Sequence, residues 1–132
     1  MKLINLILFV ILIIGFDSCK YDIDTVPAKV TLSLPDTVSF HQHIIPLFNT
    51  YCNDVGCHSG SLPPSRIKLD SVNAYSQLTK KGSGYIDTIN PANSVIYVSV
   101  ISVSNPMPPS KPLSDYNKQL LLKWIEQGAK EN

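Results

Sequence analysis

The sequence predicts a small all-α domain built from four to five short helices. Two segments have the clearest helical pattern. In residues 38–51 apolar side chains recur three and four positions apart, and in residues 114–128 they form one stripe between a capping serine and a glycine. Loops containing proline and glycine separate the shorter segments between them. The formal net charge is +1 and no stripe of Lys and Arg stands out, so a nucleic-acid partner has no support.

Residues 1–18 have the pattern of an export signal. Lys2 supplies a positive charge, and Leu3–Phe16 is an apolar run too short to span a bilayer comfortably. A small residue then precedes Cys19, which resembles a bacterial lipoprotein signal with Cys19 as the lipidated residue and residues 19–37 as its flexible tether. Acyl chains on Cys19 would anchor the exported chain to a membrane, on its periplasmic or cell-surface side. The alternatives are an uncleaved anchor and an ordinary signal that is cleaved elsewhere.

Export restricts the chemistry of the other cysteines. With Cys19 assigned to lipid, Cys52 and Cys57 are what remains of three cysteines. The compartment outside the cytoplasm is oxidising, and two free thiols are not expected to persist there. We therefore expect both sulfurs to be bonded to a cofactor, to a metal or to each other.

The first predicted helix leads to Cys52. Pro46 falls inside its apolar pattern, so the helix either continues through Pro46 or begins near Ile45, since proline fits a first turn and breaks an interior. In both cases the helix delivers Cys52 at its end.

Two shorter segments follow the cysteine pair. Leu69–Leu78 can form a short helix with Asp70 or Ser71 as its cap. Val95–Val103 is rich in β-branched residues and favours a strand by local propensity.

The last predicted helix has both of its ends marked. Ser114 can cap it, Asp115 suits the positive end of the helix dipole, and Gly128 can stop the last turn. Such an amphipathic helix needs a partner surface, and the helix before Cys52 is the obvious one. Its apolar stripe consists of Tyr116, Leu120, Leu121, Trp124 and Ile125.

The run from Cys52 to His58 carries the strongest chemical signal. A cysteine pair followed directly by histidine is how c-type haem is held, with the thiols bonded to the porphyrin vinyl groups and the histidine ligating iron. The usual spacing has two residues between the cysteines, and this chain has four, Asn53 to Gly56.

Two alternatives use the same residues. In the first, a haem-free structural or binding lipoprotein has a Cys52–Cys57 disulfide, which contributes little entropic stabilisation because the loop is short. In the second, Cys52, Cys57, His58 and either His41 or His43 form a zinc site, which has suitable ligand types but lacks the usual spacing.

The chain resembles the small, class I-like c-type cytochrome domains of exported proteins from Bacteroidetes and Planctomycetes. The matching segments run in order and cover nearly all of residues 38–130. They are Ile45-Pro46-Leu47-Phe48, Cys52 to His58, Leu69 to Leu78, Pro91-Ala92-Asn93-Ser94-Val95-Ile96-Tyr97, Met107-Pro108-Pro109 and Trp124-Ile125-Glu126-Gln127-Gly128-Ala129.

This resemblance implies a fold in which the first and last helices pack together over one covalent haem c. It also implies a helix after Ser94, against the local strand propensity. The two extra loop residues must then bulge outward for both thiols to reach the vinyl groups, with Gly56 easing the turn.

The resemblance further implies the ligands and the function. Cys52 and Cys57 become the thioether residues, His58 the proximal iron ligand and Met107 the distal one, with His41 or His43 as a less favoured replacement for Met107. A soft thioether opposite an imidazole favours Fe(II), and the prolines around Met107 stiffen its loop. The expected function is electron transfer with redox partner proteins rather than catalysis.

Overall fold

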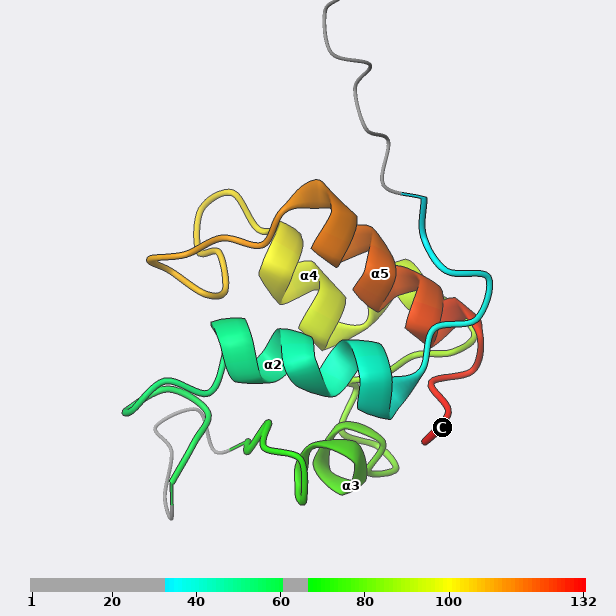
Figure 1. The fold of residues 1–132 in the computed structure, drawn as a ribbon, viewed down its shortest axis with the longest axis horizontal. Helices are drawn as coiled ribbons and strands as arrows, with labels where there is room; N and C mark the ends of the chain where they lie inside the picture. Colours follow the sequence, from blue (N-terminus) through cyan, green and yellow to red (C-terminus); the bar gives the residue numbers. More distant parts are fainter. Residues whose placement is uncertain (1–32, 61–66) are drawn as a thin grey trace, which may run out of the picture. The chain divides into compact units, whose positions relative to one another are not determined.

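The computed structural model describes residues 33–60 and 67–132, and within these ranges it contains helices and no strand (Figure 1). The predicted export signal, Cys19 and the tether up to residue 32 lie outside the described residues. Leu32–Asn132 forms one compact unit. No helix in the described ranges is long and apolar enough to cross a bilayer. The elements in chain order are the π-helix η1 (Phe40–Ile44), α2 (Ile45–Tyr51), α3 (Ala74–Leu78), the 3-10 helix η2 (Pro91–Asn93), α4 (Val95–Ile101) and α5 (Asp115–Glu126).

The predicted first helix consists of two elements that join at Ile45. The α-helix α2 begins there, with Pro46 in its first turn, which is one of the two predicted alternatives. The apolar pattern nevertheless continues upstream, because η1 is a π-helical turn whose Phe40 carbonyl accepts a hydrogen bond from the Ile45 N–H. A wider turn before Pro46 suits a residue that has no N–H to donate and whose ring crowds the preceding turn. As predicted, Cys52 lies at the end of α2 and its N–H donates to the Phe48 carbonyl at 2.8 Å.

The short helix α3 follows a turn that Asp70 stabilises. The Asp70 Oδ1 atom accepts from the N–H groups of Val72 and Asn73 at 3.0 and 2.9 Å, within the turn before α3. The helix itself begins at Ala74, with Asn73 at its N-cap and no side-chain capping bond, so the prediction that Asp70 or Ser71 caps it is wrong. Partial burial raises the pKa of Asp70, but the hydrogen bonds from Asn73 and Val72 and the charge of Lys68 outweigh it and lower the pKa below its ordinary value.

This lowered pKa makes the stabilising effect of Asp70 depend on pH. The folded state favours the carboxylate, so its contribution to the free energy of unfolding is present above the ordinary pKa of about 3.9 and is lost as the pH falls through the lower folded-state pKa. We expect wild type to be more stable than Asp70→Asn near pH 7, with the difference shrinking below about pH 4 in denaturant titrations. Ser71→Ala, at an exposed position, should show no such pH-dependent difference.

Residues 95–101 form a helix, against their strand propensity. The Ser94 side chain before α4 is fully buried, and its Oγ accepts a hydrogen bond from the Asp87 N–H at 2.9 Å. Val100 is buried, and α4 packs against α5 and η2. Packing of this kind commonly overrides the weak intrinsic preference of β-branched residues.

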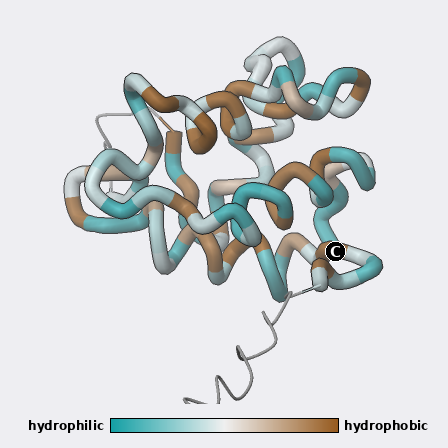
Figure 2. The backbone as a smooth tube through the Cα atoms, turned by 90° about the horizontal axis from the view of Figure 1, so that it is seen from above, coloured by the Kyte–Doolittle hydropathy of each residue, from teal (hydrophilic) through white to brown (hydrophobic). Residues whose placement is uncertain are grey.

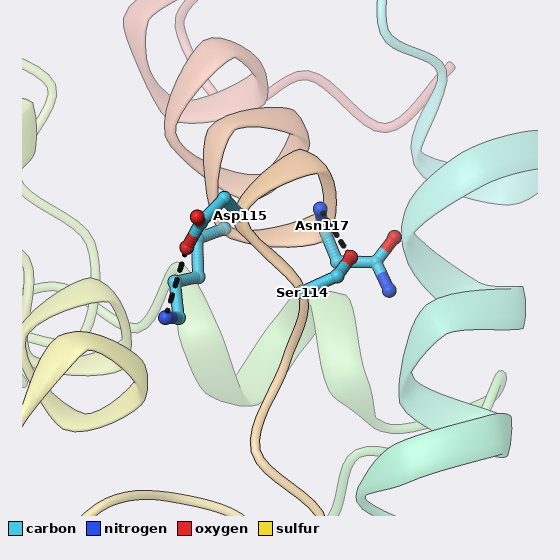
Figure 3. A network of polar contacts seen from close by, with 4 residues as sticks. Ser114, Asp115 and Asn117 are labelled. Carbon is cyan, nitrogen blue, oxygen red and sulfur yellow. Dashed lines mark hydrogen bonds and ion pairs between the residues drawn. The ribbon is translucent and has the colours of Figure 1, made fainter. Parts of the chain in front are cut away.

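The capping of α5 follows the sequence prediction. The Asn117 N–H donates to the Ser114 Oγ at 3.2 Å, and Asp115 in the first turn pairs with Lys118 at 3.3 Å (Figure 3). At the other end Gly128 has a φ of +91°, a left-handed conformation that glycine adopts without strain.

Helix α5 packs against η1, so the first and last helical segments of the folded unit are in contact. The rings of Phe40 and Trp124, both fully buried, lie 5.2 Å apart at an interplanar angle of 31°. Tyr75, from α3, meets Phe40 edge-on at 5.3 Å. These three aromatic side chains connect η1, α3 and α5. Apolar positions recur along the described part of the chain in the hydropathy view (Figure 2).

Hydrogen bonds join residues at and just before the start of η1 to the C-terminal residues of the chain. The Gln127 side chain accepts from the Val38 N–H at 2.9 Å and donates to the Asp36 carbonyl at 2.6 Å. The Asn132 carbonyl accepts from the Ser39 hydroxyl and the His41 N–H at 2.6 and 3.1 Å. The folded unit therefore includes Asp36, upstream of the predicted start at Val38.

Candidate functional site

A cavity of about 500 Å³ lies beside α2, α4 and α5, which is within the range of roughly 300–1,000 Å³ that is usual for small-molecule and cofactor sites. Four residues predicted from the sequence line it together: Cys52, Cys57, His58 and Met107. They come from the end of α2, the loop after it and the loop between α4 and α5. The other lining residues are Leu47, Phe48, Gly56, Ile67, Leu69, Leu78, Tyr85, Val95, Ile96, Ser99, Val100, Pro108, Pro109, Leu113 and Leu121.

The loop between the cysteines is compact and its tip is exposed to solvent. The His58 N–H closes it by donating to the Cys52 carbonyl at 3.2 Å, and the Cys57 N–H donates to the Asp54 carbonyl at 3.0 Å. Val55 is 99% exposed, and Gly56 has a φ of +84°. The four residues between the cysteines thus form an outward bulge at Val55 with a left-handed turn at Gly56.

The two thiols differ in their environments. Cys57 is exposed, whereas Cys52 is half-buried. Burial, together with the nearby charges of Cys57 and Asp54, raises the pKa of the Cys52 thiol to about 12. Cys52 is thus held as a neutral thiol at physiological pH.

The His58 side chain is held in one tautomer. Its Nδ1 atom lies 3.1 Å from the Ile67 carbonyl oxygen. A carbonyl oxygen can only accept a hydrogen bond, so this contact assigns a proton to Nδ1; in the neutral ring the lone pair is then on Nε2. Histidines that ligate metals commonly donate their other N–H to a carbonyl in this way, which orients the ring and makes it a stronger ligand.

The loop that carries Met107 is attached to α4 and contacts the end of α2. The Met107 N–H donates to the Ser99 carbonyl at 3.0 Å, near the C-terminal end of α4, where carbonyl groups lack helical partners. The Lys111 ammonium lies 4.6 Å from the centre of the Tyr51 ring, next to Cys52. Met107 is 39% exposed.

Two polar residues of the cavity were not predicted from the sequence. Tyr85 precedes η2 by several residues, and Ser99 lies within α4, where its hydroxyl donates to the Val95 carbonyl at 2.8 Å. Neither residue belongs to a motif, so only the folded arrangement identifies them.

His41 and His43 do not line the cavity. Both lie in η1, where the His43 Nδ1 accepts from the Ser39 N–H at 2.9 Å. Among residues 33–60 and 67–132, no three His, Cys, Asp or Glu side chains are grouped so that they would hold a metal ion. The zinc alternative thus gains no support from the described part of the chain.

Comparisons of this chain with protein-family models, with curated proteins and with solved structures found no match.

Proposed function

We propose that this protein is a monohaem c-type cytochrome that transfers electrons. One observation carries the proposal: a single cavity is lined by two thiols, an imidazole with an available Nε2 and a methionine thioether. Two thiols followed by an axial nitrogen are the attachment groups of haem c, and His with Met is a common axial pair in cytochromes c.

The donor set and the lining of the cavity fit a haem. Most lining side chains are apolar, as a porphyrin face requires. Cys52 and Cys57 would form the thioethers, and His58 and Met107 would be the axial ligands. When bound, the haem supplies an iron that cycles between Fe(III) and Fe(II).

The surrounding residues set the redox properties of such a site. The Ile67 carbonyl orients the His58 ring, and the attachment of the Met107 loop to Ser99 holds the sulfur beside the cavity. The exposure of Cys57 indicates that the cavity reaches the protein surface on that side, where a redox partner protein would approach.

The proposal extends to the setting of the protein. Lipid on Cys19 would hold the domain at a membrane, outside the cytoplasm. Covalent bonds from Cys52 and Cys57 would prevent loss of the haem there. Electron transfer between membrane-bound and diffusing redox proteins is the role that such a tethered carrier would have.

The test is an absorption spectrum and an intact mass of the full chain, expressed for export in a host that has haem-attachment machinery. We expect sharp haem bands on reduction and a mass increased by one covalent haem. His58→Ala should lose the low-spin spectrum, whereas the matched control His41→Ala should keep it, because His41 does not line the cavity. A colourless protein that is two hydrogens light would indicate a Cys52–Cys57 disulfide and overturn the proposal.

A further inference from the structure

Asn53, the residue after Cys52, connects the cysteine loop to residues 67–69. Its Nδ2 donates to the Leu69 carbonyl at 2.9 Å and to the Asn49 Oδ1 at 2.8 Å. The Leu69 carbonyl can only accept, so this contact fixes the orientation of the Asn53 amide.

The segment held by Asn53 is the one that orients His58. The Leu69 N–H donates to the His58 carbonyl at 3.1 Å, and the Ile67 carbonyl accepts from the His58 Nδ1 at 3.1 Å. Ile67 and Leu69 are both buried, and their side chains line the cavity. Asn53 and His58 therefore both bind the segment of residues 67–69. Asn53 binds the Leu69 carbonyl, whereas His58 binds the Ile67 carbonyl and the Leu69 N–H.

The remaining polar atom of Asn53 indicates that this position is not optimised for stability. Its Oδ1 atom is buried and has no hydrogen-bond partner among the described residues. A buried acceptor without a donor is destabilising, and an apolar side chain of similar volume would avoid that loss.

We propose that Asn53 is a positioning residue for the axial histidine. By holding the Leu69 carbonyl, it keeps the Ile67 carbonyl in place against the Nδ1–H of His58, and so fixes the plane of the ring and its strength as a ligand. This inference rests on the proposed haem function and adds a determinant of the reduction potential that lies outside the ligand set.

The test compares Asn53→Leu with the control Asn49→Ala in the full chain matured with haem. Asn53→Leu removes both donors and the unpartnered acceptor without changing charge, whereas Asn49→Ala removes only the contact that does not reach residues 67–69. We expect Asn53→Leu to speed hydrogen exchange of the Leu69 amide by about two- to tenfold, as the loss of one hydrogen bond implies. The reduction potential should rise, because an imidazole with a weaker Nδ1–H hydrogen bond stabilises Fe(III) less. On acidification, the same weaker ligand should dissociate from the iron at a higher pH than in wild type. Asn49→Ala should match wild type in all three measurements.

The outcomes separate this inference from the proposed function. A coloured Asn53→Leu protein with the wild-type potential and acid transition overturns the role of Asn53 alone. A colourless wild type overturns the proposed function and this inference with it. If Asn53→Leu does not mature, Asn53→Ala gives the same comparison with a smaller side chain.

Discussion

Trp124→Ala is expected to lower the free energy of unfolding by about 3–5 kcal/mol, the range for removing a large aromatic side chain from a core. Trp124 is fully buried against Phe40, and its Nε1–H donates to the Lys130 carbonyl at 2.9 Å. The substitution would leave a void between η1 and α5 and an acceptor without its donor. Domains of this size are usually stable by only about 5–15 kcal/mol, so the variant should be close to the limit of folding.

Two further variants show whether the packing explains this loss. Trp124→Phe keeps most of the ring volume and loses the hydrogen bond to Lys130, so we expect a smaller loss of roughly 1–3 kcal/mol. Val72→Ala, at a side chain that is 85% exposed, should stay within about 0.5 kcal/mol of wild type. Far-UV circular dichroism during denaturant titration measures all three, because Trp124 is the only tryptophan and its fluorescence is lost in the two Trp124 variants. A Trp124→Ala protein within about 1 kcal/mol of wild type would contradict the described packing of η1 on α5.

Local sequence signals predicted those elements whose ends are determined by neighbouring residues. Ser114, Asp115 and Gly128 mark the ends of α5 through contacts within a few positions, and the structure has each contact in place. Asp70 likewise accepts from N–H groups two and three positions ahead, but these bonds stabilise the turn before α3 and do not cap the helix, which begins at Ala74. Local signals of this kind predict the structure correctly because the side chains act on the nearest backbone N–H and C=O groups.

The π-helical turn and the helix at residues 95–101 were not fixed by local propensity. The apolar spacing before Pro46 allowed two helix starts, and nothing in that pattern indicated a wider turn. For residues 95–101 the β-branched side chains favoured a strand, and only the resemblance to cytochrome domains favoured the observed helix α4. Both segments pack against α5, which is distant in sequence, and the π-helical turn also lies directly before Pro46.

The candidate site divides in the same way. Cys52, Cys57 and His58 were predicted because their order is a chemical motif, and Met107 because its proline-rich loop resembles the corresponding segment of c-type cytochrome domains. The contacts that orient them were not predictable, because the Ile67 carbonyl has no sequence signature and Asn53 resembles any loop asparagine. A backbone acceptor becomes identifiable only when the fold brings it to 3.1 Å from the imidazole.

Substitutions of Met107 should change the redox behaviour strongly while leaving the fold intact. Under the proposed function, its thioether stabilises Fe(II) and raises the reduction potential. Met107→His supplies a nitrogen in its place, and we expect the potential to fall on the order of 100 mV, since axial ligands set haem potentials over a range of about 0.8 V. Met107→Ala supplies no ligand and should give a high-spin spectrum at neutral pH.

The position of Met107 makes these effects separable from a loss of structure. Its side chain is 39% exposed and the anchoring contact to Ser99 is made by its backbone N–H, so neither substitution removes core packing or that hydrogen bond. Redox titration followed by absorption, together with far-UV circular dichroism, measures both properties in the same samples. An unchanged potential in Met107→His with native helical content would show that another group ligates the iron opposite His58. Because His41 and His43 lie in η1 and outside the cavity lining, neither could take that role without a rearrangement of the packed η1 turn.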